Sequence, residues 1–199
     1  MPLLVAAAEN AALTAITGLA AYASLHSAYS ATGANELTGG SPAYARKAYT
    51  WATASGGTQS MSGTLTFDVP AAATVAWVGG WSASSAGTFY EMSPLGGFSP
   101  HPFTATTADV ITAPGHGLSN GQQVVFLASA GTLPTGLTEG TIYYVISVSG
   151  DTFSVSTTSG GSAVDLTAAG SGHVQRIVPE VFAAQGTYQL TAATLDIAS

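Results

Sequence analysis

The first segment with apolar residues at helical spacing is residues 4–17. Leu13, Ile16 and Ala20 recur three or four positions apart. The positions off this stripe are polar: Glu9, Asn10, Thr14 and Thr17. The pattern predicts one amphipathic helix over residues 4–17 with its apolar stripe against the core. Gly18 follows directly and is expected to end the helix.

Beyond this helix the alternation changes to a period of two, which is typical of half-buried strands. In residues 64–69, Leu65, Phe67 and Val69 share one face. Two further rows are Val75, Trp77, Gly79 and Trp81, and residues 187–191 with Leu195 and Ile197 continuing. Short strands separated by Gly- and Ser-rich turns favour a mainly β protein with an antiparallel β-sandwich or jelly-roll-like domain.

Gly and Pro accumulate at residues 95–102 and again at 178–179, and the pattern restarts between them. The strand candidates there are residues 109–112, 123–128, 141–148 and 152–156, the last two joined by a hairpin turn at 149–151. Ile142, Tyr144 and Ile146 are expected to share a face with part of the Phe153 and Val155 row. We therefore expect a discontinuous domain of residues 1–99 and 178–199, carrying residues 100–177 as a small inserted all-β domain.

Charge is the unusual property of the composition. Only 7% of the residues are charged, and three Lys and Arg against ten Asp and Glu give a net charge of -7. Without a basic patch, nucleic acid is not an expected partner. Residues 11–29 are uncharged but contain several polar side chains, so neither a signal peptide nor a membrane span is expected. So sparse a charge favours burial of the surface in an assembly, although a solitary Ser/Thr-rich secreted β protein has the same composition.

Catalytic and metal-binding patterns are not found in the sequence. It contains no Cys, no nucleophile elbow, no Walker lysine and no dinucleotide-binding glycine motif. The four His residues (His26, His101, His116 and His173) have no spacing that predicts a metal site. Asp151 and Asp165 could form a carboxylate pair, but a turn former and a solvated carboxylate explain them. We expect no catalytic residue, metal or cofactor, and interpret His26 as a hydrogen-bonded structural side chain and His116 as a turn residue.

One segment combines aromatic and cationic side chains: Tyr44, Arg46, Lys47, Tyr49 and Trp51. On a strand, Tyr44 and Arg46 would face one way and the other three the opposite way. Such a surface could stack a sugar or a partner's side chain, or Arg46 could instead form an internal bridge with Glu36. Tyr143 and Tyr144, with the Trp77 and Trp81 row, are further candidates for stacking.

Several of these segments resemble a family of small structural proteins of tailed bacteriophages, often labelled tail fibre or minor tail proteins. The resemblance lies in residues 25–27 (LHS), 33–47 (GANELTGGSPAYARK), 67–70 (FDVP), 75–82 (VAWVGGWS) and 182–190 (FAAQGTYQL). It covers about residues 1–97 and 178–199. Residues 100–177, through 116–118, 121–124, 133–134, 143–145 and 151–153, are similar to a β-module that recurs in phage tail and surface proteins.

The resemblance implies a non-enzymatic structural protein on the exterior of a tailed-phage virion. As a capsid decoration or minor tail protein, it would form a homo-oligomer on the phage major capsid or tail proteins, with the inserted module projecting outwards. Compactness, with no heptads or fibre repeats, favours decoration. The alternative is an adhesin of the tail-fibre type that binds a host cell-surface glycan. A cell-wall enzyme has only Asp151 and Asp165 to support it.

Overall fold

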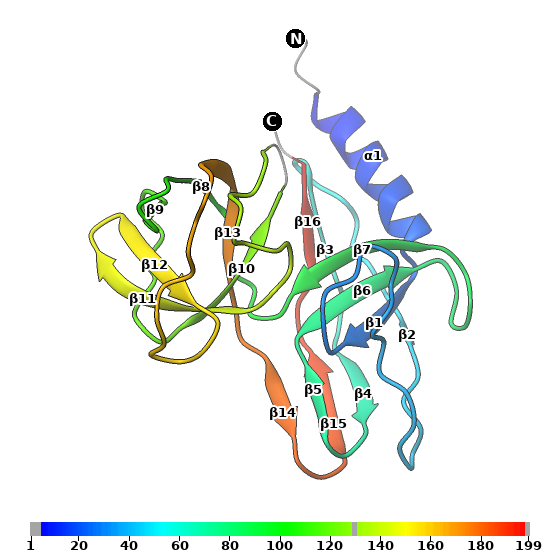
Figure 1. Ribbon diagram of the computed structural model, residues 1–199. Coiled ribbons are helices and arrows are strands. Elements are labelled where there is room, and N and C mark those ends of the chain that lie inside the picture. The colour runs from blue at the N-terminus through cyan, green and yellow to red at the C-terminus, as the bar shows by residue number, and fades with distance from the viewer. Residues whose placement is uncertain (1–4, 129–130, 198–199) are drawn as a thin grey trace. The chain divides into compact units, whose positions relative to one another are not determined.

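The computed structural model describes residues 5–128 and 131–197, which form two compact units (Figure 1). Unit 1 comprises residues 1–93 and 180–199, and unit 2 comprises residues 94–179. The described residues are mainly β, with antiparallel sheets and a single helix near the N-terminus. This confirms the predicted mainly β class. No helix in the described part of the chain is long and apolar enough to cross a membrane.

The helix α1 (Ala6–Leu19) buries only part of the face that the sequence predicts, through Leu13 and Ala20. Glu9, Leu13 and Thr17 are buried, whereas Ile16 is 38% exposed. Thr17 fits here because strand β3 (Thr58–Ser60) supplies a hydrogen-bond partner. The hydroxyl of Thr17 lies 3.0 Å from the carbonyl oxygen of Leu13 and 3.2 Å from Oε1 of Gln59. The buried stripe is therefore rotated relative to the predicted one.

The limits of α1 also differ from the prediction. Gly18 lies inside the helix, which ends one residue later and is capped by Ala20, whose N–H donates to the carbonyl of Ile16. No other residue lies within 4 Å of a Cβ placed on Gly18, so no close packing requires a glycine there. The expected start at Leu4 lies outside the described residues.

The largest sheet of unit 1 has four antiparallel strands in the order β2-β1-β6-β7. These strands are β1 (Tyr22–His26), β2 (Lys47–Ala48), β6 (Trp77–Trp81) and β7 (Phe89–Pro94). The register pairs Tyr22 with Trp81 and His26 with Trp77. Of the residues that the sequence placed on a strand around Arg46, the structure includes only Lys47 and Ala48 in one.

The C-terminal segment pairs with strands from the first half of unit 1. Strand β14 (Glu180–Phe182) pairs with β5 (Ala73–Val75), β15 (Gly186–Leu190) with β4 (Leu65–Val69), and β16 (Thr194–Asp196) with β3. Phe67 and Val69 are fully buried and Leu65 is half-buried, which confirms the predicted inward face of residues 64–69. The period of two identified this strand because one of its faces is buried.

Unit 2 contains a closed barrel in the strand order β10-β11-β12-β9-β8-β13. Its strands are β8 (His101–Ala105), β9 (Ile111–Thr112), β10 (Gln123–Leu127), β11 (Tyr143–Ser149), β12 (Thr152–Ser156) and β13 (Gly170–Ile177). The predicted strand at residues 152–156 is confirmed. Ser149 pairs with Thr152 across Gly150 and Asp151, which confirms the predicted hairpin.

The interior of the barrel contains a different row of β11 from the one predicted. Tyr143 and Val145 are buried in the core with Phe153 and Val155, whereas Tyr144 and Ile146 are only half-buried. Residues 142–146 are apolar at every position, so their sequence does not reveal which alternate residues face inwards. The expected face of Ile142, Tyr144 and Ile146 was therefore wrong.

Candidate functional site

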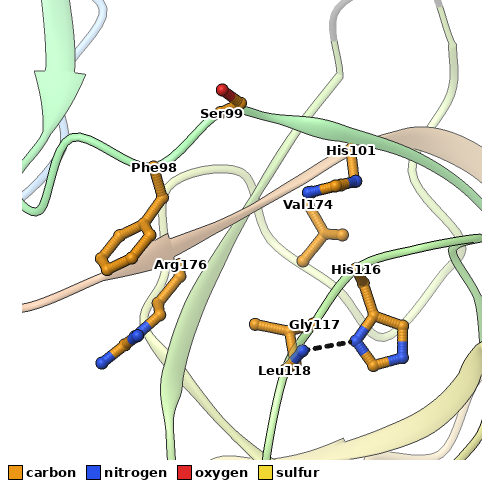
Figure 2. A pocket seen from close by; sticks show the side chains of 8 residues that line it. All are labelled: Phe98, Ser99, His101, His116, Gly117, Leu118, Val174 and Arg176. Carbon is orange, nitrogen blue, oxygen red and sulfur yellow. Dashed lines mark hydrogen bonds between the residues drawn. The ribbon is translucent and has the colours of Figure 1, made fainter.

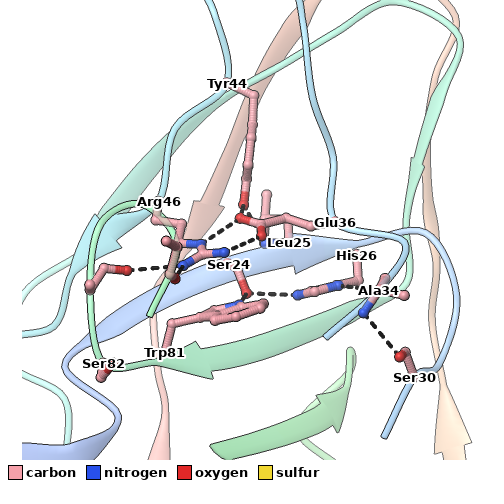
Figure 3. A network of polar contacts seen from close by, with 12 residues as sticks. Ser24, Leu25, His26, Ser30, Ala34, Glu36, Tyr44, Arg46, Trp81 and Ser82 are labelled. Atoms are coloured by element: carbon pink, nitrogen blue, oxygen red, sulfur yellow. Dashed lines mark hydrogen bonds and ion pairs between the residues drawn. The ribbon is translucent and has the colours of Figure 1, made fainter. Parts of the chain in front are cut away.

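Arg46 is fully engaged within unit 1 (Figure 3). Its Nε and Nη2 donate to the two carboxylate oxygens of Glu36 at 2.8 and 2.7 Å, and Nη1 donates to the carbonyls of Ala83 and Ala86. The guanidinium carbon lies 3.7 Å from the centroid of a Trp81 ring. The internal bridge to Glu36 that the sequence offered as one interpretation is confirmed. The guanidinium has no free edge for an external carboxylate.

The aromatic side chains around Arg46 are also partly committed. The hydroxyl of Tyr44 accepts the Leu25 N–H at 2.7 Å and donates to Glu36, and burial raises the pKa of Tyr44. The rings of Tyr49 and Trp51 lie 4.8 Å apart, and burial, with the charge of Glu91, raises the pKa of Tyr49. All three side chains are half-buried, as is Lys47. Segment 44–51 therefore offers a limited surface, mainly at Lys47, Tyr49 and Trp51.

A Ser–His pair lies beside this ion pair, and the sequence did not indicate it. Nδ1 of His26 lies 2.8 Å from the carbonyl oxygen of Ala34, which can only accept, so Nδ1 carries the proton. Nε2 then accepts from the Ser24 hydroxyl at 2.7 Å, and Ser24 Oγ accepts the indole N–H of Trp81 at 3.0 Å. Burial lowers the pKa of His26, which keeps the imidazole neutral.

The Ser24–His26 pair has the hydrogen bond of a nucleophile and its base, but it lacks room for a substrate. Both side chains are fully buried. A Cβ placed on Gly79 would lie 2.7 Å from both Ser24 Oγ and His26 Nε2. Because the backbone of β6 covers the pair this closely, no acyl or glycosyl group can reach the hydroxyl. The pair is a structural hydrogen-bond network, which confirms the interpretation of His26 as a structural side chain.

The two tyrosines suggested for stacking differ in accessibility. Tyr143 is 3% exposed, and its hydroxyl accepts the Thr138 N–H at 2.9 Å inside the barrel core. Tyr144, the next residue along β11, is half-buried. Trp77 is fully buried. Tyr143 and Trp77 therefore cannot stack on a sugar. Tyr144 and Trp81 are half-buried and remain the accessible stacking candidates.

Of the two candidate acid–base residues, Asp151 has a local structural partner. Oδ1 of Asp151 accepts the Gly115 N–H at 3.0 Å, which ties the hairpin turn to the neighbouring loop. Asp165 is exposed. His116 accepts the Leu118 N–H at Nδ1 and so donates from Nε2 to the carbonyl of Gly150. Within residues 5–128 and 131–197, no group of three or more His, Asp or Glu is arranged to hold a metal ion.

Unit 2 contains a pocket of about 240 Å³ at one end of the barrel (Figure 2). This end lies where β8 begins, at His101, and where β13 ends, just beyond Arg176. We call it the barrel-mouth pocket, and it is lined by Phe98, Ser99, His101, His116, Gly117, Leu118, Val174 and Arg176. The sequence did not indicate it because its lining comes from three separate segments.

Arg176 is the distinctive residue of the barrel-mouth pocket. Its guanidinium carbon lies 4.3 Å from the centroid of the Phe98 ring. In the part of the chain that the structure describes, Arg176 forms no ion pair, and its side chain donates no hydrogen bond. Both arginines lie over an aromatic ring, but within the described residues only Arg46 has polar partners, namely two carboxylate oxygens and two carbonyls.

These sites were compared with known proteins at the level of sequence and of structure. Neither the protein-family models, nor the curated proteins, nor the solved structures contain a match to this chain. The chain's own residues and their geometry therefore carry the functional argument.

Proposed function

We propose that this chain is a non-enzymatic structural subunit of a tailed-bacteriophage virion. It forms a homo-oligomeric accessory on the particle exterior, as a capsid decoration or minor tail protein, with residues 100–177 as its outward module. The observation that carries the proposal is the outward apolar face of α1. The β-sandwich or jelly-roll arrangement expected for the virion-attachment domain stays a prediction.

The outward face of α1 is a continuous apolar stripe. Val5, at the N-cap, is 69% exposed, and Ile16 and Leu19 are 38% and 49% exposed. With Ala8 and Ala12, they recur three or four residues apart, so they lie on one side of the helix. A solitary subunit gains nothing from exposing large apolar side chains on the same stripe, whereas a helix that packs against a second copy buries them.

The charge distribution favours assembly through this stripe. Glu9 is the only charged residue in α1, and its side chain is buried. The exposed side of the helix therefore has no charge to repel another copy. Elsewhere in unit 1, Val181 of strand β14 is a separate exposed apolar side chain, 73% exposed. In a chain with a charged fraction of 7%, neighbouring copies can pack over uncharged surface at little desolvation cost.

The location on a phage particle depends on the sequence resemblance at residues 25–27, 33–47, 67–70, 75–82 and 182–190. The structure gives several of these residues roles inside one subunit, such as the Glu36–Arg46 ion pair and the buried Trp77. A motif that stabilises the subunit is compatible with a structural protein. The glycan-binding alternative loses Tyr143 and Trp77 as stacking platforms because both are buried.

The assembly role is tested by placing charge on the apolar stripe. The double variant Ile16→Lys with Leu19→Lys is compared with the matched variant Ala11→Lys with Thr14→Lys, which places the same charge on another exposed side of α1. Sedimentation equilibrium should show an oligomer for the wild type and the matched variant, and a monomer for the stripe variant. A monomeric wild type, or a stripe variant that still assembles, would overturn the proposal.

A further inference from the structure

We propose that the barrel-mouth pocket binds a small organic carboxylate, with Arg176 as the residue that pairs with it. The ligand is the size of one acidic sugar residue or one amino-acid residue. This site is independent of the proposed virion role, because it lies within unit 2 and uses none of the residues of the α1 stripe.

Arg176 lies on the inward row of β13. It follows Val174 by two positions, and Val174 is buried in the barrel core, so both side chains point to the same face of the strand. Its cross-strand partner on β10 is Val124, another fully buried core residue. A cation on the inner row of a barrel is costly to desolvate unless an anion pairs with it. Its position at the end of the row lets a ligand reach it from outside.

His101 brings a second polar group to the same mouth. It lies opposite Val174 in the β8–β13 register, so its ring belongs to the inner face as well. His116 forms part of the lining, but hydrogen bonds within the chain occupy both of its nitrogens. The groups able to bind a ligand are therefore the guanidinium of Arg176 and the imidazole of His101, above apolar Leu118 and Val174.

The geometry of Arg176 favours a carboxylate among anions. The guanidinium lies over the Phe98 ring, and its planar fork can donate paired N–H groups to two oxygens. The pocket has one fixed positive charge in a chain whose net charge is -7, so a single negative charge is matched better than a phosphate dianion. Arg46 of this chain shows such pairing, because its guanidinium donates to both carboxylate oxygens of Glu36.

The size of the pocket limits the body of the ligand. At about 240 Å³ it lies below the range of roughly 300–1,000 Å³ that is typical for drug-sized ligands. One sugar or one amino-acid residue can enter, and a longer chain would have to extend outside. The apolar floor of Leu118 and Val174 suits the C–H face of a sugar ring or a short aliphatic side chain. We expect a dissociation constant of about 1 mM for so small a ligand.

The experiment titrates the full-length ¹⁵N-labelled protein with two pairs of probes and follows the amide resonances. Methyl glucuronide is compared with uncharged methyl glucoside, and N-acetylalanine with N-acetylalanine amide. We expect at least one carboxylate to shift resonances of residues 98–101, 116–118 and 174–176, and neither uncharged probe to do so. If methyl glucuronide binds more tightly than N-acetylalanine, the source of the carboxylate is an acidic sugar. If N-acetylalanine binds more tightly, the source is a peptide or amino acid.

Variants connect the binding to Arg176. Arg176→Gln should weaken carboxylate binding by about tenfold or more. Arg176→Lys should weaken binding less, because lysine retains the charge but lacks the planar fork of donors. Lys47→Gln removes the same charge from unit 1 and should leave the affinity unchanged. The spectrum of each variant without ligand checks the fold. No shift with either carboxylate at about 20 mM, twentyfold above the expected constant, would overturn the proposal. An Arg176→Lys protein with a native spectrum and unchanged affinity would also overturn it.

Discussion

Replacing Arg46 with Met should destabilise unit 1 far more than the loss of a surface ion pair does. The side chain of Arg46 is 9% exposed and that of Glu36 is 18% exposed, so solvent screens the pair weakly. Arg46→Met leaves the Glu36 carboxylate without its cation and the carbonyls of Ala83 and Ala86 without their donor. Breaking a buried pair on one side costs about 3–5 kcal/mol, against about 0–1 kcal/mol for an exposed pair. Because Glu36 keeps some contact with solvent, we expect about 3 kcal/mol.

A double-mutant cycle separates the ion pair from general packing. Glu36→Gln removes the charge that Arg46→Met leaves unpaired, so the double variant should be more stable than the sum of the single effects predicts. We expect a coupling energy of about 2 kcal/mol between the two positions. Lys47→Met is the matched control, because Lys47 forms no ion pair among the described residues. It should change stability by at most about 0.5 kcal/mol.

Equilibrium unfolding in urea, followed by tryptophan fluorescence, measures these effects within unit 1. The three tryptophans, Trp51, Trp77 and Trp81, all belong to that unit, so the signal reports on its unfolding. The reasoning would be refuted if Arg46→Met changed the free energy of unfolding by less than about 1 kcal/mol and the coupling energy with Glu36 were below about 0.5 kcal/mol. It would show that solvent screens the pair as it does at an open surface.

Three further predictions concern the interior of unit 1. Gly79→Ala places a methyl group 2.7 Å from polar atoms of Ser24 and His26 and should cost about 1–3 kcal/mol in urea unfolding, whereas Gly18→Ala in open space should stabilise by about 0.5–1 kcal/mol. Burial raises the pKa of Glu91 above its ordinary 4.5, so the folded state favours the protonated carboxyl group. Stability is therefore lost as the pH rises from 4.5 through the pKa of Glu91 in the folded state. Glu91→Gln should raise the melting temperature at pH 7 but not at pH 4. Burial lowers the pKa of His26 below its ordinary 6.5, so stability should fall as pH drops below 6.5, by at most about 1.4 kcal/mol per pH unit, and a His26→Gln protein without this pH dependence would confirm the source.

The sequence predicted strands well where one face of the strand is buried. Phe67 and Val69 alternate with Asp68 and Thr66, so the sequence showed which side chains of residues 64–69 face inwards. Every position from Ile142, just before β11, to Ile146 is apolar, and the predicted inward face was wrong. Strand β13 begins with Gly170, Ser171 and Gly172, which is typical of a turn in isolation. These three residues form a strand because they pair with β8, and the following residues of β13 pair with β10.

The helix and the sites show what the sequence pattern leaves out. The sequence predicted a helix, but its buried face includes Glu9 and Thr17, and Thr17 has a hydrogen-bond partner in Gln59, which lies far away in the sequence. The Glu36–Arg46 bridge joins residues ten positions apart and could be proposed from the sequence. The barrel-mouth pocket joins Phe98, His116 and Arg176, and only closure of the barrel brings such distant positions together.

The most direct test of the virion role is to measure the amount of this polypeptide in gradient-purified phage particles by quantitative mass spectrometry. A subunit that assembles on the particle exterior should be present in a fixed ratio to the major capsid or tail protein, in every fraction that contains intact particles. Decoration of the capsid predicts hundreds of copies, and a minor tail component predicts few. Intact, infectious particles without this polypeptide in a fixed ratio would contradict the account.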